Sequence, residues 1–169
     1  MYTVSNLKLL IDKQEEIDAI YQNCKELNKT IVTPKMNAEV EKLFDAINKR
    51  LVEQGFTVTV TPTGLLANYK EAVVNIDKHS KDLEECFFIN FNNYAEDRLS
   101  IILEIKHNNN AQKNANHEDG FSEFLQQMSE KLNNAKNLQD ASRIANLIYK
   151  SQNNVTFYSA EEVVNYYFN

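Results

Sequence analysis

The spacing of apolar residues changes twice along the chain, and this change constrains the fold more than any other feature. Up to about residue 51, apolar residues recur every three or four positions, as on one face of an α-helix. From Phe56 they alternate with polar residues, as in a half-buried strand, and helical spacing returns from Phe121. The order predicts an α+β fold: an N-terminal helical pair, an antiparallel sheet of about three to five strands, and C-terminal helices packed on one sheet face.

Residues 5–28 carry the first helical stripe. Its apolar members are Leu7, Leu10, Ile17, Ile20, Tyr21, Cys24 and Leu27. The spacing is that of a coiled coil, but it lasts only about three heptads and Gln14 interrupts it. We expect a break at Thr33-Pro34 and then a second helix, on which the stripe packs. This packing within one chain favours a monomer. A homodimer through residues 5–28 is the alternative.

The second helix presents its own apolar face and ends near Gly55. The face consists of Val40, Leu43, Phe44, Ile47 and Leu51. We expect residues 1–169 to form a single domain, in which residues 1–32 are one long amphipathic helix; that helix as an appendage is the other interpretation.

Several strands are predicted after residue 55. Residues 56–61 alternate between apolar residues and threonine, and Pro62 to Gly64 form a turn. Residues 65–76 fit either a strand or a short helix, because residues that favour each are mixed there. The charged residues 77–85 are predicted to be a connector.

A hairpin is predicted from residues 86–91 and 99–105, joined by the polar loop 92–98. The register that gives one apolar face pairs Phe91 with Leu99, Ile89 with Ile101 and Phe87 with Leu103. The same register places Glu84 opposite Lys106.

The C-terminal third begins with the Asn-rich residues 106–117, which we expect to form a flexible loop that folding does not require. Helical spacing over 121–132 and 138–148 predicts two helices, or one that is broken near 133–137. A short strand is predicted at 155–158. Ser159 to Glu162 form a capping box that begins a final helix.

Composition limits the classes of function. Nucleic-acid binding through phosphates needs clustered cations, whereas the 18 basic residues here are scattered along a chain of net charge -6. We therefore do not expect non-specific nucleic-acid binding. With only three glycines, the chain has no phosphate-binding loop of the P-loop or Rossmann kind. The histidines and cysteines share no ligand spacing, so no metal or other cofactor is predicted.

The sequence also bears on where the protein works. Cys24 and Cys86 lie far apart and form neither a disulfide framework nor a CxxC motif, which favours a reducing compartment. No apolar stretch approaches the roughly 20 residues that span a bilayer, and residues 1–10 lack the features of a secretory signal. We expect a cytoplasmic protein without a membrane partner. Its 23 asparagines and 15 lysines are typical of an AT-rich microbial or viral genome.

One pattern points to catalysis. Glu104 and Lys106 close an apolar strand two residues apart, so their side chains share one face. With Glu84 as the upstream acid, the arrangement resembles the end of the PD-(D/E)XK nuclease motif, although no Pro-Asp precedes the hairpin. The resemblance implies a metal-dependent nuclease in which Glu84 and Glu104 bind Mg²⁺ and Lys106 helps to activate water.

The preferred hypothesis is a non-enzymatic factor that binds another protein, as an adaptor, a chaperone-like factor or an inhibitor. It assigns no catalytic residue, and the nuclease is kept as the alternative. Seven apolar or aromatic residues from the two ends of the chain are the candidate interaction surface. They are Leu7, Leu10, Ile17, Tyr21, Tyr166, Tyr167 and Phe168.

Overall fold

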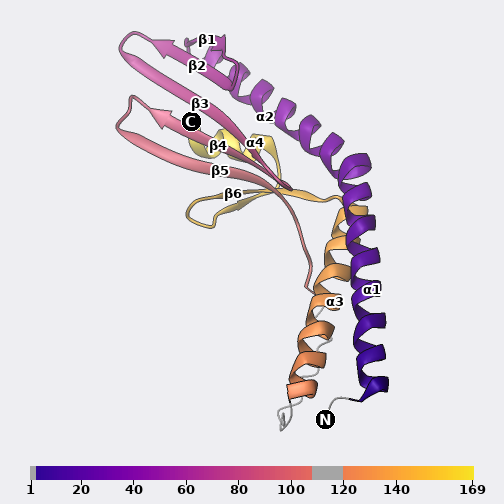
Figure 1. The fold of residues 1–169 in the computed structure, drawn as a ribbon. Coiled ribbons are helices and arrows are strands. Elements are labelled where there is room, and N and C mark those ends of the chain that lie inside the picture. The colour runs from indigo at the N-terminus through magenta and orange to yellow at the C-terminus, as the bar shows by residue number, and fades with distance from the viewer. Residues whose placement is uncertain (1–2, 108–119) are drawn as a thin grey trace. The chain divides into compact units, whose positions relative to one another are not determined.

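The computed structural model describes residues 3–107 and 120–169, which form two compact units (Figure 1). A helical unit contains residues 1–31 and 105–145, and a sheet unit contains residues 32–104 and 146–169. In the sequence, most of the sheet unit is therefore inserted between the two helices of the helical unit. The loop predicted at 106–117 lies outside the described residues from residue 108 onward.

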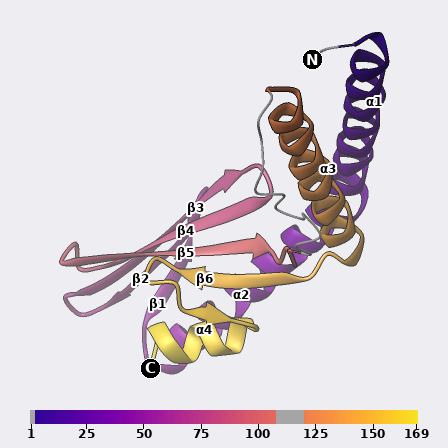
Figure 2. The same ribbon diagram turned by 90° about the horizontal axis from the view of Figure 1, so that it is seen from below.

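The helical unit consists of α1 (Val4–Leu27) and α3 (Gly120–Ile144), which lie side by side and run in the same direction (Figures 1 and 2). Leu10 and Ile17 of α1 are buried against Met128 of α3. Further along both helices, the amide of Gln139 donates a hydrogen bond of 2.9 Å to Asn23. Part of the predicted apolar stripe is thus covered within one chain, as in a two-stranded parallel coiled coil.

The predicted packing of this stripe on the second helix is wrong. The second helix, α2 (Thr33–Glu53), uses its apolar face for the core of the sheet unit. The predicted break is also absent, because the backbone stays helical through a π-helical segment, Asn28–Val32. Pro34 is the second residue of α2.

The sheet has seven antiparallel strands in the order of the sequence, which exceeds the predicted number. The strands are β1 (Thr57–Val60), β2 (Gly64–Tyr69), β3 (Ala72–Lys81), β4 (Glu84–Phe91), β5 (Ala95–Leu103), β6 (Leu147–Ser151) and β7 (Thr156–Phe157). The ambiguous residues 65–76 supply most of β2 and the start of β3. The predicted connector at 77–85 is instead the tip of the β3–β4 hairpin, where Lys81 pairs with Glu84. These residues are charged because the strand ends are exposed, and opposite charges can pair across the strands.

The register predicted for the β4–β5 hairpin is wrong by four residues. Phe87 pairs with Leu99, and the hairpin turns at Asn92 and Asn93 instead of through a seven-residue loop. Both asparagines have positive φ values, of 52° and 58°, a conformation that asparagine tolerates better than most residues. Because the shift is even, every side chain stays on its predicted face.

One face of the sheet forms the core, and α2 and α4 (Ala160–Tyr167) lie on that side (Figure 2). Leu43 of α2 and Val163 of α4 are fully buried there, together with Phe87 and Ile101 of the sheet. The opposite face, which includes Glu84 and Arg98, is covered by no described helix of the sheet unit.

The C-terminal elements agree partly with the predictions. Ser159 caps α4 by accepting a hydrogen bond of 3.2 Å from the backbone N–H of Glu162, as the capping box predicts. By contrast, α3 is one unbroken helix, and Ile148 belongs to β6 and not to a helix. No helix in the described ranges is long and apolar enough to cross a membrane.

Candidate functional site

Glu84 is the first residue of the candidate nuclease set. Its carboxylate is bound by neighbouring side chains of the sheet. Its Oε1 accepts hydrogen bonds from Ser100 Oγ at 2.7 Å and from the Cys86 thiol at 3.1 Å. The same oxygen lies 3.4 Å from the guanidinium of Arg98. Glu84 pairs with Ile102 across the hairpin, and not with Lys106 as predicted, because of the four-residue register shift.

The other two residues of that set follow the last residue of β5. Glu104 follows the end of β5, where its carboxylate accepts a hydrogen bond from Asn146. Lys106 is exposed and lies in the helical unit. Among the described residues, no group of three histidine, cysteine or acidic side chains is placed to hold a metal ion. A shared role for these two acids and one lysine stays a prediction, which the cleavage assay below tests.

The environment of Glu84 predicts a dependence of stability on pH. The hydrogen bond from Ser100 is the main reason that the pKa of Glu84 is lowered from 4.5, followed by the bond from Cys86. A lowered pKa means that folding favours the ionised carboxylate, so this contribution is present above 4.5 and is lost as the pH falls through the folded-state pKa.

We expect Ser100→Ala to lower the free energy of unfolding by about 1–2 kcal/mol at pH 7, because it removes a hydrogen bond to a charged group. The difference from wild type should shrink as the pH falls below 4.5. Urea unfolding between pH 3 and pH 7 measures this. In a Glu84→Gln background, Ser100→Ala should have an effect that does not vary over this range. A constant loss in the wild-type background as well would contradict this account.

The nuclease alternative can be tested directly. We expect purified protein to cleave neither DNA nor RNA with Mg²⁺ or Mn²⁺. Lys106→Ala should cost at most about 1 kcal/mol in stability, because the side chain is exposed beyond the end of β5. Metal-dependent cleavage that the wild type performs and the Lys106→Ala variant does not would contradict this prediction and restore the alternative.

The predicted interaction residues are divided between buried and exposed positions. Leu10 and Ile17 are buried against α3, and Phe168 is buried beside Phe91 in the sheet core. Tyr167 is half-buried. The exposed members are Leu7, Tyr21 and Tyr166. Leu7 and Tyr21 lie on α1, and Tyr166 lies on α4. Because three of the seven residues are buried, the predicted interaction surface is not exposed as a whole.

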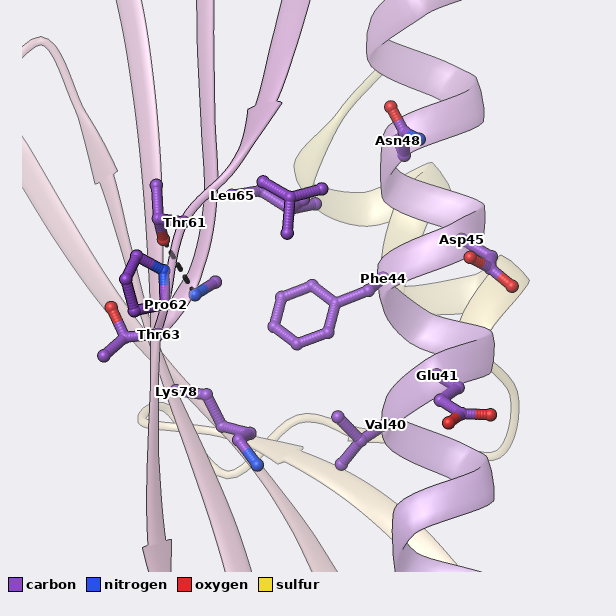
Figure 3. Close-up of a pocket in the computed structure, with 12 residues that line it drawn as sticks. Val40, Glu41, Phe44, Asp45, Asn48, Thr61, Pro62, Thr63, Leu65 and Lys78 are labelled. Atoms are coloured by element: carbon purple, nitrogen blue, oxygen red, sulfur yellow. Dashed lines mark hydrogen bonds between the residues drawn. The ribbon is translucent and has the colours of Figure 1, made fainter.

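A groove that the sequence did not indicate lies between α2 and the turn that joins β1 to β2. Its volume is about 400 Å³. The walls are Val40, Glu41, Phe44, Asp45 and Asn48 from α2, residues 60–65 from the strands and their turn, and Lys78 from β3. Figure 3 shows the ring of Phe44 pointing from α2 toward the strands and Leu65 pointing back toward it. The interior is therefore mainly apolar.

The position of α2 over the sheet is fixed by packing and by a partly buried hydrogen bond. Phe44 packs edge-on against Phe87 of β4, with the ring centroids 5.5 Å apart. The hydroxyl of Tyr149 in β6 donates a hydrogen bond of 2.6 Å to Glu39, and burial together with this bond raises the tyrosine pKa. These contacts hold the helical wall of the groove in place.

The strand wall depends on a tight turn. Gly64 donates a backbone hydrogen bond to Thr61 Oγ1 at 2.9 Å, and the N–H of Thr61 donates to the carbonyl of Gly64 at 2.9 Å. A Cβ at Gly64 would lie 1.8 Å from the carbonyl oxygen of Ile76, so only glycine lets β2 approach β3 here.

The charges of the groove lie at its rim and at one end. Glu41 and Asp45 lie one turn apart on α2, with their carboxylates turned toward solvent (Figure 3). Neither has an ion-pair partner in the part of the chain that the structure describes. Lys78 points into the groove, and its ammonium lies 3.9 Å from Glu85. The groove thus offers a mainly apolar interior with one lysine at its end, and two exposed carboxylates on α2 at its rim.

One edge of the sheet adjoins the groove. In the described residues β1 pairs only with β2, so its other edge has no strand partner. Val60, the last residue of β1, lines the groove and is 77% exposed. Sequence alone marks residues 56–61 as a strand, but it does not say that this strand is an edge, because that depends on the topology of the whole sheet.

No family model, curated protein or solved structure matches the chain.

Proposed function

We propose that the protein is a non-enzymatic binding factor that holds a segment of another protein in the groove between α2 and β1. An adaptor or an inhibitor in a microbial or viral cytoplasm would act in this way. The observation that carries the proposal is an apolar groove beside a sheet edge that has no strand partner in the described residues and whose last valine is largely exposed. Exposed sheet edges and exposed apolar patches both favour association, and such patches mark interaction sites.

The size and chemistry of the groove support one large apolar side chain as its occupant. Its volume of about 400 Å³ is in the range of ligand pockets, and Val40, Phe44 and Leu65 give it an apolar lining. Glu41 and Asp45 at the rim favour a basic residue next to that side chain, and the net charge of -6 favours approach of a basic segment.

The test is selection from a displayed library of random twelve-residue peptides on the purified full chain. We expect enrichment of peptides with an apolar residue close to lysine or arginine. Asn48→Trp places an indole at one end of the groove and should weaken the selected peptides at least about tenfold, since it removes space that the apolar side chain needs. Lys49→Trp adds the same side chain at the neighbouring position, which does not line the groove, and should bind like wild type.

A second pair of variants tests the charge. Glu41→Lys with Asp45→Lys should weaken binding by about three- to thirtyfold, as expected for the loss of two exposed ion pairs. Glu15→Lys with Glu53→Lys changes the net charge equally at exposed positions that do not line the groove. No enrichment, or selected peptides that bind the Asn48→Trp variant as well as wild type, would contradict the proposal.

A further inference from the structure

We infer that the bound segment is extended and adds to the sheet as a strand along β1, with an apolar residue and a basic residue two positions apart facing α2. This inference rests on the proposed function and specifies how the groove recognises its partner. Strand addition to an exposed sheet edge is a recurrent way to bind peptides, in which main-chain hydrogen bonds give affinity and side-chain pockets give specificity.

The direction of the free main-chain groups follows from the hydrogen bonds of the turn. The N–H of Thr61 donates to Gly64, so these two residues form a hydrogen-bonded pair. Such pairs alternate along antiparallel strands, and the register therefore makes Thr59 opposite Leu66 the next one. The N–H and C=O groups of Val58 and Val60, which lie between these positions, point away from β2 toward the free edge.

The side chains of Val58 and Val60 lie on the face of the sheet that α2 covers. They pair with Ala67 and Leu65, which are buried in the core on that face. A residue of an added strand opposite Val60 projects to the same face, where the groove accepts an apolar side chain. Side chains two residues apart on a strand share a face, so a lysine or arginine two positions away also points toward α2 and its acidic rim.

Charge favours a foreign segment over a second copy of this chain. Edge-to-edge pairing of two β1 strands would follow a two-fold axis perpendicular to the joined sheet and would place both α2 helices on the same face. Glu41 and Asp45 of both copies would then border one seam, and like charges that face each other are unfavourable. A basic segment has the complementary charge.

The inference is tested with the peptides selected on the wild-type chain. Val60→Pro and Val58→Pro each remove one outward N–H that β2 does not use, so the strand should remain paired, since proline is tolerated on edge strands in this orientation. We expect each variant to keep the thermal stability of wild type and to weaken peptide binding at least about tenfold. Val60→Ala keeps the N–H and should weaken binding less than Val60→Pro.

A second measurement uses the unmodified protein, in case a proline variant does not fold. N-methylation of successive amides of a selected peptide should weaken binding at alternate positions, since only every second N–H of an added strand faces β1. Uniform tolerance of N-methylation, together with full binding by both proline variants, would overturn strand addition. If the same peptides still fail to bind the Asn48→Trp variant, binding in the groove would stand and only strand addition would be overturned.

Sedimentation of the wild type tests whether a second copy of the chain, and not a foreign segment, occupies the β1 edge. A mass near 19.6 kDa is expected for a free edge. A wild-type mass of about twice that value, which Val60→Pro returns to that of the monomer, would assign the edge to a second copy and overturn the inference.

Discussion

Replacement of Phe87 by alanine should lower the free energy of unfolding by about 3–5 kcal/mol, the usual cost of emptying a fully buried aromatic site. Phe87 is 0% exposed at the centre of the sheet, and its ring contacts Phe44 on α2. The variant should therefore also loosen the helical wall of the groove. Urea unfolding followed by circular dichroism measures the loss.

Tyr94→Ala is the matched control, because this aromatic residue in the β4–β5 turn is 91% exposed. It should change the stability by no more than about 0.5 kcal/mol. Equal losses for the two variants would mean that the sheet core is not where the structure places it.

Introduction of aspartate at Ile17 should unfold the helical unit and leave the sheet unit folded. Ile17 is 2% exposed between α1 and α3, and a carboxylate there has no cation to pair with in the described apolar cluster. Burial of an unpaired charge costs several kcal/mol, which is more than a two-helix contact supplies. Because the core of the sheet unit contains no residue of α1 or α3, it should keep its own unfolding transition.

Ile11→Asp is the control for this prediction, since Ile11 lies on the same helix but is 51% exposed. It should leave the helical unit intact. Circular dichroism and amide exchange of the two variants make the comparison. Loss of protection in β3, β4 and β5 of the Ile17→Asp variant would show that the two units do not fold independently.

The sequence predicted the features of the fold that depend on neighbouring residues. The change of apolar period located α2 and β1, and the capping box at Ser159 located the start of α4. These predictions succeed because helical periodicity, alternation and capping are set within about one turn or one strand.

Features that depend on residues far apart in the sequence were either not predicted or predicted wrongly. The apolar stripes of three helices are equivalent in sequence, and only the tertiary structure shows that α1 packs on α3 while α2 covers the sheet. The β4–β5 register depends on a tight turn at Asn92 and Asn93, and the seven-residue loop assumed for it fits the same apolar pattern. An even shift leaves that pattern unchanged, so it could not reveal the error.

The candidate site predicted from the sequence differs from the groove found in the structure for a related reason. An assumed register placed Glu84 opposite Lys106, and the observed register places Glu84 opposite Ile102 instead. The groove was not predicted, because it joins residues of α2 to a turn that follows β1, and no local motif links these segments. Its strand wall does carry one local signal, the glycine of the Pro62 to Gly64 turn.

The most direct test of the groove and its sheet edge is a nitrogen-15 correlation spectrum of the full chain, recorded with and without a selected peptide. The account predicts that the amides of Val58 and Val60 shift and become protected from exchange with water, because they acquire hydrogen bonds along the free edge. Thr59, whose N–H already faces β2, should change its protection little. Shifts confined to α1 and α3, with the amides of Val58 and Val60 unchanged, would contradict the account.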